Sequence, residues 1–308
     1  MRILVTGGLG HIGSNLIRSL NEYELIVVDD FMTQRYASLF NLSLETKIDF
    51  HEKRVQDITE EWLRKVGPID VIVHLSATTD ASGNANNREA LFENNHRGTD
   101  HLARLALRLG IKFIFPSSTS VYGSQSNLVD ETCEDLLPQS PYAESKLEEE
   151  KLLLKLAVEG LEVAILRFGT IHGASIGMRF HTAVNRFIFQ TKLGIPLTVW
   201  RTALDQKRPY LSLTDCVSSV HHVIRKSLFS GEVYNIVTKN WTVREIIENI
   251  ESVSGIETQI NLVDVVIMNQ LSYEVSSEKF THTGFTFNGN LRQDIEETLV
   301  LLDGIRNV

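Results

Sequence analysis

Cysteine is scarce in this sequence. Among 308 residues only Cys133 and Cys216 occur, and they form no C-x-x-C pair. Two thiols with this spacing favour a reducing compartment and argue against a disulfide framework or a cysteine-based zinc site. We therefore expect two unpaired thiols and no metal centre.

Runs of basic residues and long apolar stretches are also missing. The formal net charge is -9, and without a Lys/Arg-rich segment the chain lacks the basic surface that a nucleic-acid partner requires. No apolar stretch reaches the roughly 18 residues of a membrane span, and Met1 leads directly into RILV without a charged leader. We expect a cytoplasmic protein that binds neither nucleic acid nor membrane.

The first half of the sequence alternates two patterns. Short apolar runs rich in β-branched residues cover 2–7, 24–30, 69–77, 111–118 and 161–169. Because they are almost continuously apolar, they are typical of buried parallel strands. Helical spacing covers 11–23, 90–110 and 141–160 between them. The alternation predicts the α/β class, with a doubly wound parallel (Rossmann) sheet and right-handed crossovers.

After residue 165 the alternation becomes irregular. We expect a helix over 179–194, short strands near 196–200 and 208–213, a helix from Thr214, a strand over 232–237 and two further helices. This mixture predicts a smaller, partly interleaved C-terminal α/β domain.

Residues 6–13 read TGGLGHIG and connect the first strand to the first helix. In this context Gly7 permits a tight turn, Gly10 lets the backbone approach a pyrophosphate, and Gly13 lets helix and strand pack closely. The phosphates would lie at the helix N-terminus. Asp29 ends the second strand, where a carboxylate binds adenosine ribose hydroxyls, and Asp29 with Asp30 would repel a 2′-phosphate. The motif favours NAD over NADP, although a flexible turn is the alternative.

A phenol and an ammonium lie four residues apart in the segment Tyr142 to Lys146, on one face of a predicted helix. A neighbouring cation favours the anionic form of a tyrosine, so Lys146 could bring Tyr142 into the range of a working base. Ser118 ends a predicted strand at the edge where open parallel sheets bind ligands. Taken alone, the pair could arise by chance and the serine could be a turn cap.

In combination these motifs resemble the extended short-chain dehydrogenase/reductases, in their branch of nucleotide-sugar epimerases and dehydratases that includes UDP-glucose 4-epimerase-like proteins. TGGLGHIGS is similar to TGxxGxxGS, HLSA to H-[LF]-A-[AG], and NNHRGT to NNVxGT. SSTSVYG, PYAESK, LRFGTIHG and KRPYLSLTDCV resemble the catalytic and substrate segments of that family. The matches follow one order along nearly the whole chain.

The resemblance implies roles for individual residues. The catalytic set would be Ser118, Tyr142 and Lys146. NAD would be held by Gly7, Gly10, His11, Ile12, Gly13, Asp29, Asp30, Asp57, Ile58, Leu75, Ser76, Ala77, Asn95, Tyr142 and Lys146. A nucleotide-diphosphate sugar would contact Thr78, Ser118, Thr119, Thr170, Arg179, Asn185 and Arg208. Residues 1–167 with about 208–236 would bind NAD, residues 168–207 and 237–308 would bind the sugar nucleotide, and a homodimer is expected.

The residues after Ser118 distinguish the possible reactions. Dehydratases of this family carry Asp-Glu there and decarboxylases carry Glu before VYG, whereas this chain has Thr119 and Ser120. Without these carboxylates, elimination of water lacks its general acid and base. We therefore expect NAD-dependent epimerisation at C4 through a transient 4-keto sugar. A 4-ketoreductase, a dehydratase and a non-catalytic NAD-binding protein remain as alternatives.

The chain also departs from the family pattern. Thr170 replaces the Asn of LRxxNVYG, His172 replaces its Tyr, and Ser212 replaces the His of RDFIH. The segment LSYEVSSEKF contains no arginine, although many epimerases have one in this region. These changes predict altered contacts to the sugar or its phosphates.

Overall fold

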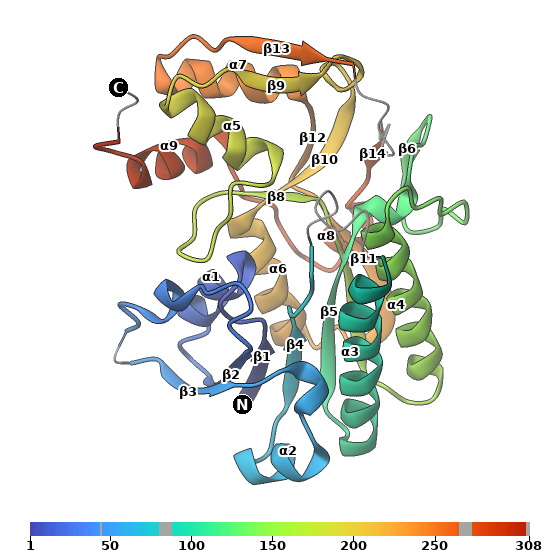
Figure 1. The fold of residues 1–308 in the computed structure, drawn as a ribbon. Coiled ribbons are helices and arrows are strands. Elements are labelled where there is room, and N and C mark those ends of the chain that lie inside the picture. The colour runs from blue at the N-terminus through green and yellow to red at the C-terminus, as the bar shows by residue number, and fades with distance from the viewer. Residues whose placement is uncertain (44, 80–87, 265–272, 306–308) are drawn as a thin grey trace.

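A seven-stranded sheet forms the centre of the computed structural model, which describes residues 1–43, 45–79, 88–264 and 273–305 (Figure 1). Its order is β11-β7-β5-β4-β1-β2-β3, and every pair is parallel. The strands are β1 (Arg2–Thr6), β2 (Glu24–Asp29), β3 (Lys47–Glu52), β4 (Val71–His74), β5 (Lys112–Ser118), β7 (Val163–Phe168) and β11 (Ser230–Ile236). The strand order reverses between β1 and β4, which confirms the predicted doubly wound fold.

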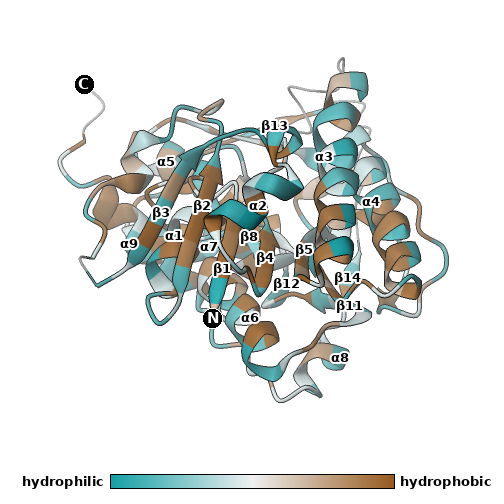
Figure 2. Cartoon of the chain, turned by 90° about the horizontal axis from the view of Figure 1, so that it is seen from below, coloured by the Kyte–Doolittle hydropathy of each residue, from teal (hydrophilic) through white to brown (hydrophobic). Residues whose placement is uncertain are grey.

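Helices cover both faces of this sheet. On one face lie α1 (His11–Ser19) and α6 (Leu213–Lys226), and on the other lie α2 (Glu60–Val66), α3 (Arg88–Leu109) and α4 (Pro141–Val158). Successive strand residues alternate between the two cores: Ile3 and Val5 join the first, and Leu4 joins the second. Figure 2 shows the apolar strands enclosed between the helices.

The edge strand β3 was not anticipated from the sequence. Its residues KIDFHE alternate in burial, and their apolar members are half-buried, because only one side of the strand has a neighbour. A short, partly polar strand of this kind lacks the continuous apolar run that marks the central strands.

The second part of the chain lies above the carboxyl ends of the sheet strands in Figure 1. A three-stranded sheet contains β8 (Thr170–His172), β10 (Lys207–Ser212) and β12 (Lys239–Thr242), while β9 (Leu197–Trp200) pairs with β13 (Ile260–Val263). The helices there are α5 (Ala183–Lys192), α7 (Val243–Ser254) and α9 (Leu291–Leu301). They enclose a separate core that includes Val184, Phe187, Ile246 and Ile295.

Three short elements complete the described chain: β6 (Leu128–Val129) pairs with β14 (Glu274–Val275), and α8 (Glu278–Thr281) follows. Four 3₁₀ segments are η1 (Tyr36–Leu39), η2 (Val55–Asp57), η3 (Thr119–Tyr122) and η4 (Arg201–Ala203). Within the described ranges, no helix combines the length and apolar character that crossing a membrane requires.

Local sequence fixes the start of α4. The side chain of Ser140 accepts a hydrogen bond from the backbone N–H of Ala143, and Pro141 occupies the first turn. Both features are typical of a helix N-terminus. Tyr142 is therefore held in the first turn of α4, at the same edge of the sheet as the glycine turn.

Candidate active site

The glycine turn after β1 is packed against its surroundings at Gly7, Gly8 and Gly13, and a Cβ on Gly8 would lie 2.4 Å from Val27 Cγ1. Gly7 has φ +67°, and a Cβ added there would lie 2.6 Å from the backbone nitrogen of Ser76. A Cβ on Gly13 would lie 2.5 Å from the carbonyl oxygen of Gly7. A Cβ on Gly10, in contrast, would meet protein atoms only at 3.3 Å and beyond. Gly7 and Gly13 are thus required by the fold, while the protein itself could accommodate a small side chain at Gly10.

The N-terminus of α1 begins at this turn. Its N-cap, Gly10, provides no side-chain hydrogen bond to the helix, so the N–H groups of the first turn are suited to an anion. Arg35, from the loop after β2, comes within 3.4 Å of the position of a Gly10 Cβ. Burial and the nearby charge of Arg179 lower the pKa of Arg35, whereas Asp29 opposes this shift. Two cations therefore gather beside the helix N-terminus, where a diphosphate would fit.

Asp29 is anchored beside the same turn. Its Oδ2 accepts from the backbone N–H of Leu9 at 3.1 Å and its Oδ1 from that of Phe31 at 3.0 Å. Burial raises the pKa of this carboxyl, and the two backbone hydrogen bonds oppose the shift. Asp30 is exposed and accepts from the N–H of Met32. The structure thus positions Asp29, the predicted ribose ligand, against the turn and leaves Asp30, the second predicted cofactor carboxylate, at the surface.

The loop that follows β8 lies on the glycine turn. His11 Nδ1 is 2.8 Å from Ser175 Oγ, and the N–H of Gly177 donates to Ser14 Oγ at 3.0 Å. Burial lowers the pKa of His11 to about 3, assisted by nearby cationic groups that include His181 and Arg35. The predicted cofactor residue His11 is thus a neutral contact between the two parts of the chain.

The remaining predicted cofactor residues differ in how exposed their side chains are. Half-buried Ile12 packs against the core formed with α6. Asp57 is exposed at the end of η2, whereas the side chain of Ile58 is fully buried in the core behind the sheet. The carbonyl of Ile58 lies 2.7 Å from His101 Nε2.

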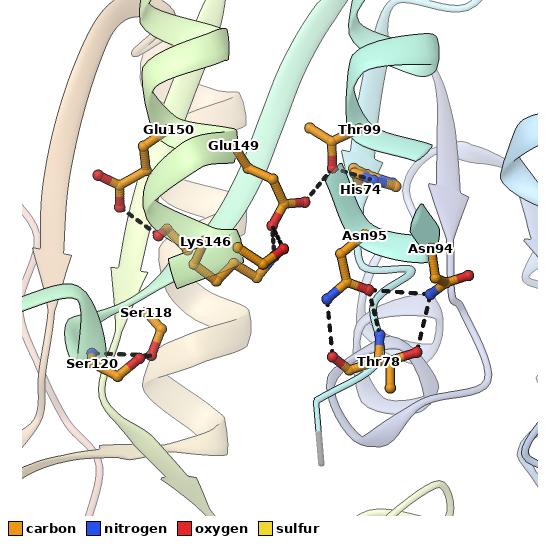
Figure 3. A network of polar contacts seen from close by, with 12 residues as sticks. His74, Thr78, Asn94, Asn95, Thr99, Ser118, Ser120, Lys146, Glu149 and Glu150 are labelled. Carbon is orange, nitrogen blue, oxygen red and sulfur yellow. Dashed lines mark hydrogen bonds and ion pairs between the residues drawn. The ribbon is translucent and has the colours of Figure 1, made fainter. Parts of the chain in front are cut away.

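Asn95 fixes the segment that follows β4. Its Oδ1 accepts from the N–H of Thr78 at 2.8 Å, and its Nδ2 donates to the carbonyl of Thr78 at 3.0 Å (Figure 3). Leu75, Ser76 and Ala77 precede this clamp and are half-buried along the sheet edge. The amide of Asn95 therefore holds the loop that was predicted to line the cofactor.

Ser118 and Tyr142 meet at the carboxyl edge of the sheet. Ser118 ends β5, and its side chain is close enough to Tyr142 to lower the pKa of that phenol, against the stronger effect of burial. The hydroxyl of Ser120 donates to Ser118 Oγ at 2.9 Å. Burial, followed by the charge of Glu149, raises the pKa of Tyr142, and the nearby Ser118 side chain opposes this shift. The two predicted acid-base groups are therefore adjacent, with Tyr142 favoured as the neutral phenol.

Lys146 is buried one helical turn after Tyr142. Its Nζ lies 4.3 Å from the centroid of the Phe115 ring and 3.5 Å from Glu149 Oε2. Figure 3 shows Lys146 beside Glu149 on α4. This carboxylate is not evident from the sequence, because the acidic run that follows Lys146 is also typical of a solvated helix face.

Thr119 contacts a residue from a distant part of the chain. Its Oγ1 lies 3.3 Å from the hydroxyl of Tyr273, a buried residue in the segment before β14. Arg208, on β10, is close enough to Tyr210 and Tyr273 to lower the pKa of each phenol, against the stronger effect of burial. The structure thus gathers Thr119, Arg208 and Tyr273 on the side of the edge away from the glycine turn.

Three other predicted substrate residues lie on the second part of the chain. Half-buried Thr170 pairs with Tyr210 between β8 and β10. Arg179 donates from Nη2 to Thr79 Oγ1 at 2.7 Å, which brings it to the sheet edge. Asn185 is fully buried, and both ends of its amide bind the backbone of Gly173. Its observed contacts are structural.

His172 forms a buried pair with Asp294 of α9, with 2.8 Å between Nδ1 and Oδ2. It packs near the rings of Tyr210 and Trp241. The substitution that departs from the family pattern at this position is therefore accommodated inside the second core. Across the described residues, no group of three or more His, Cys, Asp or Glu side chains could hold a metal ion.

Comparison with known proteins agrees with this geometry. The chain is 30% identical over 279 residues to YtcB of Bacillus subtilis (strain 168), an uncharacterized UDP-glucose epimerase, covering 86% of each protein. UDP-glucuronic acid 4-epimerase from Bacillus cereus, solved with UDP-glucuronic acid and NAD, superposes with a TM-score of 0.86 at 27% identity, covering 98% of this chain and 100% of that one. DesIV, a dTDP-glucose 4,6-dehydratase from Streptomyces venezuelae solved with NAD and TYD, shares the fold with a TM-score of 0.85 at 24% identity, covering 97% of this chain and 96% of that one.

A model of one enzyme family also matches residues 3–237, which span the sheet from β1 to β11 together with the glycine turn, Ser118, Tyr142 and Lys146. The match and the relatives confirm the predicted enzyme class, nucleotide-sugar epimerases, and the predicted cofactor, NAD. The chain belongs to the NAD dependent epimerase/dehydratase family.

Proposed function

We propose that this enzyme epimerises a nucleotide-diphosphate sugar at C4 through a transient 4-keto sugar. The observation that carries the proposal is that Ser118, at the end of β5, and Tyr142, in the first turn of α4, lie near each other at the edge that also holds the glycine turn. The likeness to a UDP-glucuronic acid 4-epimerase supports it.

The residues at the turn fit NAD. Gly10 leaves room for close approach of a pyrophosphate, Arg35 and the N-terminus of α1 supply positive charge, and the fixed carboxylate of Asp29 suits ribose hydroxyls. When bound, NAD would accept a hydride from C4 of the sugar and return it to the opposite face of the 4-keto sugar after that sugar has turned over in the site. We assign the adenine side to Asp30, Asp57 and the backbone of Ile58.

Tyr142 and Ser118 handle the proton of the sugar hydroxyl. As C4 is oxidised, Tyr142 takes the proton of the C4 hydroxyl, and as the keto group is reduced, it gives that proton back. Ser118 donates a hydrogen bond to the same oxygen. The environment of Tyr142 favours the neutral phenol, which suits the returning step, while the ammonium of Lys146 supports the phenolate in the first step.

The side chains after Ser118 favour epimerisation over elimination. Thr119 contacts Tyr273 and Ser120 contacts Ser118, and both are hydroxyls. Neither residue supplies a carboxylate to remove a C5 proton or to protonate a leaving hydroxyl. A 4-keto sugar formed here would therefore be reduced again instead of losing water.

The second part of the chain would bind the sugar nucleotide. We assign Arg208 and Arg179 to phosphate oxygens, because guanidinium groups bind phosphate in a bidentate way. Thr78, Thr119 and Thr170 would contact the sugar, and Asn185 would hold the loop that carries Arg179. The NAD domain would comprise residues 1–167 with 208–236, and the sugar-nucleotide domain residues 168–207 with 237–308.

The test begins with purified protein. Denaturation should release NAD, and incubation with UDP-, GDP- and dTDP-sugars should yield a C4 epimer without added cofactor. Tyr142→Phe should lower kcat by about 10²- to 10⁴-fold, since it removes the proton carrier. Tyr23→Phe, which removes a phenol at the opposite end of β2, serves as the matched control. Stoichiometric consumption of NADH or NADPH with a keto-sugar would instead identify a ketoreductase, and elimination products a dehydratase.

We also assign a cytoplasmic location and a homodimer formed through helices of the catalytic domain, of which α3 and α4 lie side by side in Figure 1. Light scattering on a size-exclusion column should give twice the chain mass of 34.8 kDa. A mass of one chain would contradict the dimer without affecting the proposed reaction.

A further inference from the structure

A buried carboxylate lies directly behind the catalytic helix face. Glu149 is 1% exposed, and its Oε2 lies 3.5 Å from the Nζ of Lys146, which is 3% exposed. A carboxylate taken out of water at such a position is costly unless a cation and hydrogen bonds compensate for it. Both are present here, because Oε1 accepts a 2.5 Å hydrogen bond from Thr99 Oγ1.

The hydrogen bonds continue from Thr99 to β4 and β1. Thr99 Oγ1 lies 3.2 Å from His74 Nε2 (Figure 3). His74 Nδ1 in turn lies 2.7 Å from Thr6 Oγ1. Burial, with the charge of Lys146, lowers the pKa of His74 to about 3, so this ring is neutral. Four elements therefore contribute one side chain each to a chain of contacts that ends at Glu149.

The donors and acceptors in this row of hydrogen bonds follow from the carboxylate of Glu149 at its end. A carboxylate only accepts, so the hydroxyl of Thr99 donates to Glu149. The oxygen of Thr99 is then available to accept from Nε2–H of His74, which leaves Nδ1 to accept from Thr6. The donor and the acceptor of each hydrogen bond in the row are assigned in this way. Glu149 is thereby fixed in orientation, and its Oε2 faces Lys146 Nζ at 3.5 Å while also accepting a 3.4 Å hydrogen bond from Ser145 Oγ.

The same carboxylate acts on the catalytic phenol. Among the described residues, the titratable groups that face this cluster are His74 from β4 and Tyr142 and Lys146 from α4, while α3 and β5 contribute Thr99 and Phe115. The neighbouring Glu150 faces Arg167 of β7 instead. The negative charge of Glu149 disfavours the phenolate of Tyr142 and offsets the positive charge of Lys146.

We propose that Glu149 is a positioning residue that holds the ammonium of Lys146 and thereby sets the pH at which Tyr142 exchanges its proton. The inference rests on the proposed function, because that function assigns the proton exchange to Tyr142. It gives the Thr6, His74 and Thr99 side chains a defined role, which is to hold the Glu149 side chain in one orientation.

Glu149→Gln in the NAD-loaded enzyme tests this proposal. The amide keeps the shape and can still accept from Thr99, but it removes the charge. We expect the acid limb of the kcat/KM profile to move to lower pH by about one unit. The matched control is Glu148→Gln, which removes the same charge from an exposed neighbour that pairs with Lys151, and it should leave the profile unchanged. Superposition of the Glu149→Gln and wild-type profiles would overturn the proposal.

A second readout does not depend on turnover. Phenolate absorbance is titrated in the wild type and in Glu149→Gln, and the signal of the corresponding Tyr142→Phe protein is subtracted from each. Tyr142 should ionise at lower pH in the variant. If no sugar is epimerised by the wild type, the proposed function fails, whereas this titration still decides the role of Glu149.

Variants at Thr99 provide a second test in case Glu149→Gln does not fold. Thr99→Val removes the hydrogen bond that orients Glu149, so the carboxylate is held less firmly beside Lys146 and Tyr142, and both readouts should shift in the same direction by a smaller amount. Thr99→Ser retains the hydroxyl and should restore the wild-type profile. A lowered melting temperature with unshifted pH readouts would show a merely structural role and would contradict the inference.

Discussion

The backbone N–H of Gly177 donates a 3.0 Å hydrogen bond to Ser14 Oγ, so the loop after β8 rests on the first turn of α1. The approach is close: a Cβ on Gly177 would lie 2.4 Å from the carbonyl oxygen of Leu9 and 2.5 Å from that of Gly10. The part of the chain assigned to the sugar nucleotide is thus in contact with the turn assigned to the pyrophosphate.

Gly177→Ala should therefore weaken cofactor retention. The added methyl group forces the loop away from the glycine turn and opens the cofactor site, and we expect NAD affinity to fall about tenfold, or about 1.4 kcal/mol. Calorimetric titration of cofactor-stripped protein with NAD measures this. Ile176→Ala changes an exposed neighbour in the same loop and should bind NAD like the wild type. Equal affinities for all three proteins would show that the loop contact does not influence the cofactor.

Gly10→Val separates binding from folding. Because the nearest protein atoms to a Cβ at this position are 3.3 and 3.4 Å away, the fold should tolerate the change with a small loss of stability. The side chain would occupy the space of the pyrophosphate, so the purified variant should release little NAD on denaturation. The measurements are released NAD and the melting temperature.

Gly13→Val is the corresponding control for folding. Its Cβ would lie 2.5 Å from the carbonyl of Gly7, so this variant should unfold at a clearly lower temperature than Gly10→Val. A Gly10→Val protein that still carries one NAD per chain would refute the assignment of the turn.

Glu150→Gln should be strongly destabilising. Glu150 and Arg167 form a buried pair at 2.7 Å, Ser117 also contacts the carboxylate, and Arg167 Nη1 donates to Tyr122 at 2.8 Å. Removing one partner leaves a buried guanidinium without its counter-charge, which costs about 3–5 kcal/mol of unfolding free energy. Urea unfolding followed by circular dichroism measures the change, and the exposed Glu148→Gln again provides the comparison. A loss below about 1 kcal/mol would mean that solvent reaches the pair.

His74 should make stability depend on pH. Its pKa is lowered from 6.5 to about 3 by burial, so between these values the unfolded chain binds a proton that the folded chain does not. The unfolding free energy should then fall as the pH decreases from 6.5 toward 3, with up to about 1.4 kcal/mol lost per pH unit from this group. His74→Gln should lack this contribution.

The relevant quantity is the difference in unfolding free energy between wild type and His74→Gln at pH 7, 6 and 5. It should shift in favour of the variant as the pH decreases. A constant difference would show that His74 is protonated in the folded protein, or in neither state.

The sequence alone could predict the central sheet because its inner strands are buried on both faces. Strands β1, β2, β4, β5 and β7 appear as continuous apolar runs for that reason. The edge strand β3 has no such signal, since its residues alternate between half-buried and exposed. The glycine turn and the helix that carries Tyr142 could also be predicted from the sequence. Both depend on the identity and spacing of residues that are close together in the chain.

Other parts of the site depend on contacts between residues that are far apart in the chain. Tyr273 reaches Thr119 across 154 positions, and nothing near either residue indicates the partner. Glu149 belongs to an acidic run in which Glu148 is exposed and Glu150 faces Arg167. Only the three-dimensional position of Thr99 and Lys146 distinguishes the three carboxylates.

Strand β11 completes the edge of the seven-stranded sheet, yet β10 and β12, its neighbours along the chain, both belong to the three-stranded sheet above. The polypeptide therefore passes from one sheet to the other and back. No single truncation point separates the seven-stranded sheet from the three-stranded sheet. A truncated protein would therefore lack a strand of one sheet or the other. An engineer who wishes to exchange substrate-binding parts between relatives must transplant at least two separate segments, joined on both sides of α6 and β11.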